Sequence, residues 1–448
     1  MASLAQTLQR IKHNPLAFLD RHMIEEAAHA AGHRWRNREL DPATTLALFV
    51  QQVIHGNTPC AQVRHIVGRS FTASAYCQAR ARLPLSACQA MLHRVHELAV
   101  LPSISKEEHR WRGHRTFHID GSSFSMSDTP ELRRSFGGAA GPATGCGFPV
   151  AHLLVLFSAS TGLLLDAFAA PLRIGDLQET PQLHLHLEKG DLLIGDDSFS
   201  GYAHLALLVA AQLHGLFPVH HCRIVDFTPN RPHLAQNRAH SRRPHSRWVA
   251  ALGKDDQIVE YFKPRNCPSW LSREQYAALP DSILVRELRR TVRTASGKKL
   301  TLTMVSTLLD PRLYPAQELL KLRQRRWDVE TNLRHLKITM GLDVLRCKSE
   351  LGVRKELCVF CLVYNLVRLL MLEAAHRQRV EVARISFADA LRWLRHARPG
   401  DPLPALLVNP LRHRFEPRCR KRRPKKYLLM NKPRHILRKA LQKQGERA

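Results

Sequence analysis

The order of predicted strands and helices between residues 115 and 221 constrains the fold of this chain more than any other feature. Short apolar runs bounded by glycine and polar residues predict strands, and longer amphipathic runs predict helices. The expected elements in chain order are strands at 115–120, 150–157 and 162–170, a helix at 179–188, a strand at 191–196, a helix at 202–213 and a strand at 216–221. This alternation predicts an α/β fold.

Three strands, a helix, a strand, a helix and a strand is the order of a ribonuclease H-like core, in which the first strand is central and lies beside the fourth. Asp120 ends the first predicted strand, and Asp196 ends the fourth. Side chains at the ends of neighbouring strands meet at one edge of a sheet. The sequence therefore predicts that these two acids converge.

Residues 315–340 predict one helix that carries an acid among cations. At about 100° per residue, Arg323, Arg326, Glu330 and Lys337 fall within roughly 60° of one another around the helix axis. Arginines hold phosphate oxygens through forked hydrogen bonds, and a carboxylate among them can hold a divalent cation. An exposed helix with Arg–Glu pairs has the same pattern, so this stripe alone leaves both interpretations open.

The whole chain is strongly basic. It contains 68 Lys and Arg against 38 Asp and Glu in 448 residues, which gives a formal net charge of +30. A protein this basic is expected to have a polyanionic partner, and nucleic acid is the leading candidate. Charge alone does not separate an enzyme from a packaging protein.

Six regions are expected along the chain, because the pattern changes on both sides of the core and within it. They are a helical N-terminal DNA-binding region (1–110), the first part of the core (111–222), a mainly β insertion (223–309), the final core helix with its glutamate (310–345), a helical C-terminal region (346–405) and a basic tail (406–448). The N-terminal bases expected to hold DNA include Arg64, Arg69, Arg80, Arg82 and Arg94.

The ten cysteines are scattered and fit a reducing cytoplasm better than a secreted disulfide scaffold. The close pair Cys358 and Cys361 lies in an apolar run that predicts a buried helix rather than a zinc site. The N-terminus has no charged segment followed by an apolar core, and Arg368 interrupts the longest apolar run. We therefore expect a cytoplasmic protein without a membrane partner.

Three motifs in this order resemble a known family. Asp120-Gly-Ser, Gly195-Asp-Asp-Ser-Phe199 and the Arg-Trp-x-x-Glu-x6-Lys element around Glu330 resemble the acidic motifs of DDE transposases in the bacterial insertion-sequence-four family. Tyr76-Cys-Gln-Ala-Arg80 and Asn57-Thr-Pro are similar to the N-terminal helical region of that family. The resemblance covers most of the chain from residue 115 to about residue 365.

The resemblance implies that Asp120, Asp196 and Glu330 are catalytic and hold two divalent ions, Mg²⁺ or Mn²⁺. Asp197 follows Asp196 and is the alternative second acid. The family pattern favours Asp196, because it places a phenylalanine three residues after the acid, which Phe199 satisfies.

The resemblance also implies how DNA is held. Arg326 and Lys337 would grip the phosphates of the transposon end, and Arg323 stands where the family signature has tyrosine. Arginine keeps the ability to bind phosphate but loses aromatic packing, so contacts to the DNA end are expected to differ here. Trp248, in the insertion, is a candidate for stacking on a flipped base, and a packed tryptophan is the alternative.

The expected function is that of a Mg²⁺-dependent DNA transposase at the bacterial nucleoid. It would bind the inverted repeats of an insertion sequence, cleave at the element ends and join the 3′-OH ends to target DNA, as a homodimer on DNA. Two alternatives stay open: an inactive transposase-derived DNA-binding protein, and a nuclease on the same fold.

Overall fold

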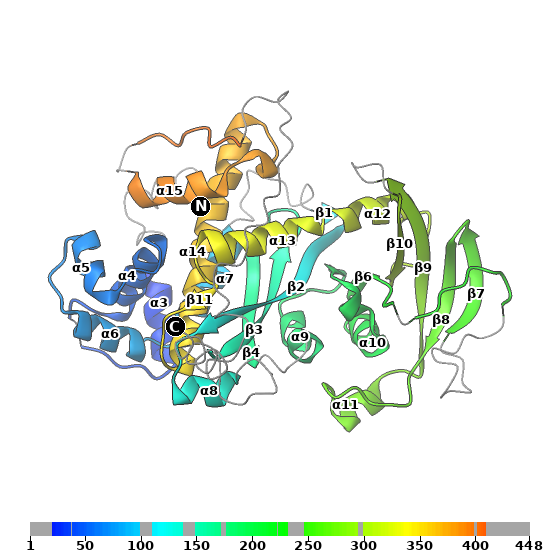
Figure 1. The fold of residues 1–448 in the computed structure, drawn as a ribbon, viewed down its shortest axis with the longest axis horizontal. Coiled ribbons are helices and arrows are strands. Elements are labelled where there is room, and N and C mark those ends of the chain that lie inside the picture. Colours follow the sequence, from blue (N-terminus) through cyan, green and yellow to red (C-terminus); the bar gives the residue numbers. More distant parts are fainter. Residues whose placement is uncertain are drawn as a thin grey trace, which may run out of the picture.

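The structure is a computed structural model, and it describes residues 20–36, 38–98, 110–137, 148–171, 176–221, 223–231, 246–293, 299–397 and 401–408. This described part is built around one mixed sheet of 11 strands (Figure 1). The N-terminal helices lie at one end of the molecule, and the strands predicted as an insertion lie at the other end. Most of the basic tail predicted at 406–448 lies outside the described residues.

Five strands have the order predicted for the core. They are β2 (His114–Met126), β3 (Val150–Ser158), β4 (Leu164–Pro171), β5 (Leu192–Ile194) and β6 (His214–Pro218). Their order across the sheet is β4-β3-β2-β5-β6, in which β3 is antiparallel to β2 and β4, and β5 is parallel to β2 and β6. The first of these strands thus lies beside the fourth, as the sequence predicted.

β2 is longer than the predicted strand 115–120, so the prediction that Asp120 ends this strand is wrong. Gly121 continues the antiparallel ladder with β3. Further along, Ser125 pairs with β3 on one side and with the parallel strand β11 (Val344–Leu345) on the other. Pairing on both sides overrides the weak strand preference of the Asp-Gly-Ser sequence.

The predicted insertion does not form a sheet of its own but extends the central sheet. Its strands are β7 (Ser246–Gly253), β8 (Asp256–Phe262), β9 (Ser282–Arg293) and β10 (Lys299–Ser306), and the short helix α11 (Arg273–Ala278) lies between β8 and β9. They form an antiparallel meander, and β10 pairs with β6 in the register Met304↔Pro218. β6 is therefore not an edge strand, because β10 pairs with its outer side through main-chain hydrogen bonds.

The N-terminal helices share a hydrophobic core with the sheet and with the C-terminal region. These helices are α3 (Arg21–Ala30), α4 (Pro42–Ile54), α5 (Cys60–Val67), α6 (Ala73–Arg82) and α7 (Leu85–Leu98). One cluster of buried side chains joins α4 and α7 to β3, β4 and the long helix α14 (Glu350–Gln378). The N-terminal region is therefore docked on the sheet and not merely tethered to it.

Helix α14 is the central helix of this core. By length and composition it could cross a membrane, but 94% of its most apolar window is buried inside the protein. Cys358 and Cys361 lie in it and are buried, as predicted for a core helix. Helix α15 (Phe387–His396) packs on α14, and both are seen beside the N-terminal helices in Figure 1.

The remaining short elements connect these parts. They are β1 (Arg110–Trp111), α8 (Pro130–Phe136), α9 (Asp176–His184), the 3₁₀ turn η1 (Asp197–Ser200), α10 (Tyr202–Ala210) and the 3₁₀ turn η3 (Val382–Arg384). Helix α9 begins and ends earlier than the predicted helix 179–188, and it contains Pro181.

Arg80, which the sequence predicts to contact DNA, belongs to a structural polar network in the protein itself. Its guanidinium carbon lies 3.6 Å from the ring centroid of Phe49. Its N–H groups donate to Oε1 of Gln52 at 2.9 Å and to Sγ of Cys347 at 3.1 Å. Lys355, which is 2% exposed, donates to three carbonyl oxygens at the C-terminal end of α6, at 2.9 to 3.0 Å. This network fixes α6 against α14.

The segment 315–340 is broken and does not form the single predicted helix. It consists of α12 (Ala316–Gln324), α13 (Trp327–Arg334) and a π-helical turn, η2 (His335–Thr339). At the junction between α12 and α13, backbone N–H groups donate to carbonyl oxygens three residues earlier instead of four. The sequence has no Gly or Pro there. The tightened turn accompanies an inward-turned Arg326, which pairs with two acids.

Candidate active site

Asp120, Asp196 and Glu330 reach the same region from three elements. The last paired residues of β2 and β5 are His118 and Ile194. Asp120 and Asp196 each follow this pair by two residues, so they lie at the same level of two adjacent parallel strands. Helix α13 packs against β2 and carries Glu330 to this place (Figure 1).

Arg326 connects two of these acids. Its guanidinium lies 3.4 Å from Oδ2 of Asp120 and 2.9 Å from Oε1 of Glu330. The side chains of Arg326 and Asp120 are 15% and 13% exposed, whereas that of Glu330 is 44% exposed. A cationic group is thus held between carboxylates from β2 and α13. These contacts occupy the guanidinium of Arg326 in the free protein. Contact of Arg326 with DNA phosphate stays a prediction.

The charges of the three acids act on one another. Burial raises the pKa of Asp120 to about 6, Arg326 opposes this shift, and the charges of Asp196 and Glu330 add to it. Burial also lowers the pKa of Arg323 to about 10, helped by the charge of Arg326, while the three acids act in the opposite direction. The structure therefore brings together all three predicted acids, with Arg323 and Arg326 among them.

Asp196 and Asp197 point to different partners. Asp196 accepts hydrogen bonds from the backbone N–H of Ser198 at 2.9 Å and from its hydroxyl at 2.5 Å. Its charge acts on both Asp120 and Arg323. Asp197 instead lies 3.9 Å from Nδ1 of His221. The arrangement favours Asp196 as the acid that faces Asp120.

Lys337 lies on the same side of the sheet as Asp120. Its ammonium donates to the hydroxyl of Ser122 at 2.8 Å, and burial lowers its pKa. Ser122 is two residues after Asp120, so both side chains lie on one face of β2. Sequence reasoning did not predict a role for Ser122 or for Ser198, although each follows a predicted acid by two residues.

His118 lies on this face too, but inside the protein. It is 1% exposed, and burial lowers its pKa to about 3, with the charges of nearby arginines acting in the same direction. It is therefore neutral at ordinary pH.

Trp248 is not brought to the acids. It lies on β7, the outermost strand of the meander, and its indole N–H is buried without a hydrogen-bond partner among the described residues. β7 is separated from β2 by six strand-to-strand steps, which span roughly 28 Å. A DNA contact by Trp248 would therefore involve DNA that extends away from the acids.

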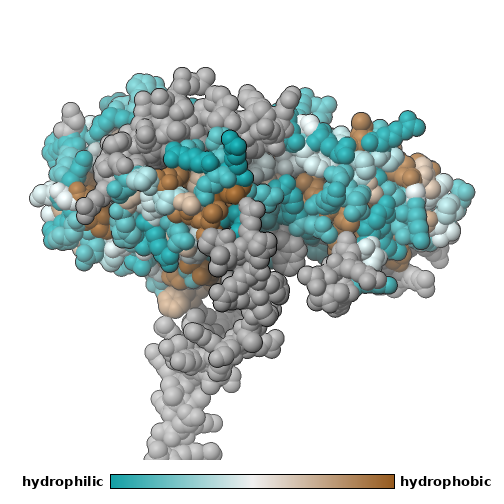
Figure 2. All heavy atoms as spheres, turned by 90° about the horizontal axis from the view of Figure 1, so that it is seen from above, coloured by the Kyte–Doolittle hydropathy of each residue, from teal (hydrophilic) through white to brown (hydrophobic). Residues whose placement is uncertain are grey.

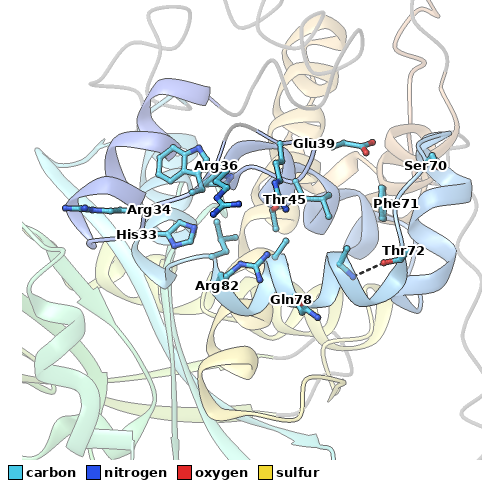
Figure 3. Close-up of a pocket in the computed structure, with 17 residues that line it drawn as sticks. His33, Arg34, Arg36, Glu39, Thr45, Ser70, Phe71, Thr72, Gln78 and Arg82 are labelled. Atoms are coloured by element: carbon cyan, nitrogen blue, oxygen red, sulfur yellow. Dashed lines mark hydrogen bonds between the residues drawn. The ribbon is translucent and has the colours of Figure 1, made fainter.

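A basic cavity lies in the N-terminal region, between the start of α4 and helix α6. It has a volume of about 610 Å³. Figure 3 shows Arg34, Arg36 and His33 on one side, Arg82 beside them, and Phe71 across the cavity. Arg38 and Trp35 also line it, and Glu39 is the acid in its lining. Cationic and aromatic groups around one hollow suit a nucleic-acid backbone and its bases.

The surface drawn in colour in Figure 2 is mostly hydrophilic. Seen from above, hydrophilic side chains cover most of the surface that is drawn in colour, and hydrophobic ones form only small patches between them (Figure 2). Together with the net charge of +30, this favours electrostatic binding of DNA over burial in an apolar interface.

Comparisons with known proteins identify the family of the chain. Residues 111–366, which are more than half of the chain, match the family model of the transposase DDE domain. The transposase InsG for insertion sequence element IS4 of Escherichia coli strain K12 is 26% identical over 381 residues, which is 80% of this chain and 79% of that protein.

Solved transposase structures are more distant. A cryo-EM structure of piggyBac transposase in a synaptic complex with hairpin DNA has a TM-score of 0.37 at 9% identity, covering 88% of this chain and 80% of that chain. The Mos1 transposase paired-end complex with the left transposon end has a TM-score of 0.16 at 12% identity, covering 41% and 60%. The assignment rests on the sequence comparisons: the chain belongs to the DDE transposase domain family and is a transposase of the insertion-sequence-four type.

Proposed function

We propose that this transposase binds the inverted repeats of its insertion sequence, cleaves at the element ends and joins the freed 3′-OH ends to target DNA. Its catalytic acids are Asp120, Asp196 and Glu330, carried on a ribonuclease H-like core. The observation that carries this proposal is the meeting of acids from β2, the end of β5 and α13: Arg326 pairs with Asp120 and Glu330, and the charge of Asp196 acts on Asp120.

The donor set fits divalent metal ions. Three carboxylates from separate elements offer only oxygen atoms, which Mg²⁺ and Mn²⁺ prefer, and their mutual repulsion is relieved by a cation. In the free protein Arg326 supplies part of that positive charge. We propose that Asp120, Asp196 and Glu330 hold two such ions, which supply an activated nucleophile and stabilise the leaving oxygen in phosphodiester chemistry.

The protein groups around the acids have separate roles in the proposal. Because burial raises the pKa of Asp120 to about 6, this acid is mostly ionised at neutral pH but lies close to the protonated range. Ser198 orients Asp196 through two hydrogen bonds. Arg323 and Lys337 offer cationic groups for the phosphates beside the scissile bond, and Arg326 can exchange its carboxylate partners for phosphate. Hydrolysis and strand transfer then differ only in whether water or a 3′-OH attacks phosphorus.

DNA beyond the scissile phosphate is proposed to follow the basic surface. The N-terminal cavity lined by Arg34, Arg36, Arg38 and Arg82 is suited to the inner part of the inverted repeat. Trp248 remains a candidate for stacking on a base. The proposed assembly is a homodimer on DNA that acts at the nucleoid, in the cytoplasm of a bacterial cell.

The proposal is tested with the substitution Glu330→Gln. We expect the purified variant to bind duplex DNA that carries the element's ends as the unmodified protein does, and to lose cleavage in the presence of Mg²⁺. The matched control is Glu318→Gln, because Glu318 is an acid on the neighbouring helix α12 that pairs with Lys321 at the surface. Undiminished cleavage by Glu330→Gln would remove Glu330 from the catalytic site.

A strand-transfer assay with the unmodified protein separates this function from the two alternatives. A transposase yields element DNA that is covalently joined to target DNA. A nuclease on the same fold yields cleaved ends only, and an inactive DNA-binding protein yields neither product.

A further inference from the structure

A second group of metal-binding side chains lies away from the three acids, where the N-terminal region meets the sheet. It consists of His93 on α7, Asp166 on β4 and His186, which follows α9. One potential ligand atom from each of the three residues lies within 4.8 Å of those from the other two. The segments that carry them are far apart in sequence, and α7 and α9 both pack on β4.

The carboxylate of Asp166 is fixed in orientation. Its Oδ1 accepts the backbone N–H of Ala167 at 2.6 Å, and its Oδ2 lies 2.7 Å from Nε2 of His186. Asp166 is 6% exposed, so this pairing lies inside the protein. Because the backbone holds Oδ1, Oδ2 is the oxygen that faces the imidazole of His186. The ring of His93 completes the group, with its centroid 5.1 Å from that of His186.

The chemistry of this group differs from that of the three acids. Two imidazole nitrogens and one carboxylate oxygen suit zinc-type transition metals and disfavour Mg²⁺ and Ca²⁺. Tetrahedral zinc with such ligands has them about 3.4 Å apart. Adjustments of about 1 Å therefore convert the present arrangement, with distances from 2.7 Å up to 4.8 Å, into a coordination sphere with one position left for water.

Two cysteines near Asp166 are not expected to enter this sphere. Burial raises the pKa values of Cys358 and Cys361 well above the ordinary range, and the charge of Asp166 acts in the same direction. Binding of a metal ion by these thiols would require loss of their protons inside the core, and neither thiol belongs to the group of close ligand atoms. The ligand set is the two histidines and the aspartate.

We infer that His93, Asp166 and His186 bind one zinc-type divalent metal ion that fastens helix α7 to the sheet. This ion is structural and separate from the ions of phosphodiester chemistry, so the inference does not rest on the proposed function. Its effect is to lock the N-terminal helices, with their basic cavity, onto the core.

Another group with suitable residue types, Asp197, His220 and His221, serves as the control. It lies at the surface, where the side chains of His221 and Asp197 are 78% and 45% exposed, and the pair is 3.9 Å apart. Its ligands are not fixed by burial, so tight binding is not expected there.

The experiment uses the full chain after removal of metals with a chelator. In the presence of excess Mg²⁺, which competes for the three acids, we expect one equivalent of Zn²⁺ to bind tightly in a calorimetric titration, and Co²⁺ to give the visible absorption of a low-coordinate nitrogen and oxygen site. At a free Zn²⁺ concentration of about 100 times Kd, the ratio of folded to unfolded protein should rise about 100-fold, seen as a higher unfolding temperature.

Two substitutions remove ligands with little change in shape. His93→Gln leaves the Asp166–His186 pair intact, and Asp166→Asn keeps the size of the side chain. Each should weaken Zn²⁺ binding at least tenfold, while His221→Gln should leave it unchanged. Circular dichroism of the metal-free variants checks that they are folded.

Three results would overturn the inference. They are no stoichiometric binding by the unmodified protein, unchanged Zn²⁺ affinity in folded His93→Gln or Asp166→Asn, and a Co²⁺ spectrum with sulfur charge-transfer bands, which would assign the metal to cysteines. Failure of the unmodified protein to cleave DNA, together with intact Zn²⁺ binding, would contradict the proposed function and leave this inference standing.

Discussion

The substitution Arg326→Gln tests whether the guanidinium of Arg326 supplies, in the free protein, positive charge between Asp120 and Glu330 that a bound metal ion would otherwise supply. Arg326 lies 3.4 Å from Asp120 and 2.9 Å from Glu330, and removing its charge leaves three carboxylates with less compensation. Two unit charges about 4 Å apart attract by about 1 kcal/mol in water and by about 4 kcal/mol at an effective dielectric constant of 20. Since about 1.4 kcal/mol corresponds to one pH unit, the pKa of Asp120 should rise by roughly one to three pH units.

In the unmodified protein the pKa of Asp120 is about 6. Divalent metal binding requires the ionised carboxylate, so its affinity should level off above about pH 6 in the unmodified protein and continue to rise beyond about pH 7 in Arg326→Gln. At high pH the variant should bind metal at least as tightly, because the competing guanidinium is gone. DNA cleavage should stay impaired there if Arg326 also contacts phosphate.

Stability should change in the same pH window. A raised pKa of Asp120 in the folded state means that this state holds its proton more tightly than the unfolded state does. The contribution of Asp120 to the free energy of unfolding therefore falls as pH rises from the ordinary value of 3.8 to the folded-state value of about 6. In Arg326→Gln this decline should extend to a higher pH.

The assay is a calorimetric titration of Mn²⁺ at several pH values from about pH 5 to about pH 9, a range that brackets the expected pKa values. Arg325→Gln is the matched control, since it removes the same charge from an exposed neighbour for which no ion pair with Asp120 or Glu330 is seen among the described residues. The same pH profile in all three proteins would refute the argument that Arg326 sets the electrostatics of these acids.

Three further substitutions test the scaffold and the DNA contacts. Lys355→Met should lower the free energy of unfolding by about 3 to 5 kcal/mol, because three carbonyl oxygens lose a buried charged donor. In chemical denaturation the exposed ion-pair variant Arg392→Met should lose less than about 1 kcal/mol, and equal losses would contradict this account. Lys337→Met should weaken DNA binding and reduce the slope of log affinity against log salt by about 1, so an unchanged slope would exclude a phosphate contact. Trp248→Ala should lower DNA affinity by about 1 to 3 kcal/mol while Trp248→Phe retains most of it, and equal affinity in both variants and the unmodified protein would mean that Trp248 only packs.

The core strand order could be predicted from local sequence because each strand and helix has its own periodicity. The order three strands, helix, strand, helix, strand then restricts which strands are neighbours. This placed Asp120 and Asp196 on adjacent strands before any contact was known. The error in the length of β2 did not matter for their convergence, because β5 ends at Ile194 and both acids lie two residues beyond the last β2–β5 pair.

Features that depend on contacts between distant segments could not be predicted in the same way. The pairing of β10 with β6 joins residues that are some 88 positions apart, and nothing in either strand encodes its partner. The contacts of Arg80 with Phe49 and Cys347 join distant segments, so the sequence did not predict them. The sequence around Arg326 has no helix breaker, so neither the tightened turn nor the contact of Arg326 with Asp120 could be predicted from it.

The site was predictable in its residue types but not in its polar contacts. The motifs pointed to the acids and to the cations near them, whereas the roles of Ser122 and Ser198 depend on geometry. The spacing of two residues in Asp120-Gly-Ser and Asp196-Asp-Ser is a usable signal, because a short polar side chain two residues after an acid either shares its strand face or caps its turn.

The central claim is that acids from separate elements together bind the catalytic metal ions, and a change of metal preference tests it most directly. Asp196→Cys replaces a hard oxygen ligand with sulfur, which transition metals accept better than Mg²⁺ does. We predict that this variant fails to cleave DNA with Mg²⁺ and regains measurable cleavage with Mn²⁺, whereas Asp197→Cys stays active with Mg²⁺. Full activity of Asp196→Cys with Mg²⁺, or the switch to Mn²⁺ appearing in Asp197→Cys instead, would contradict the account.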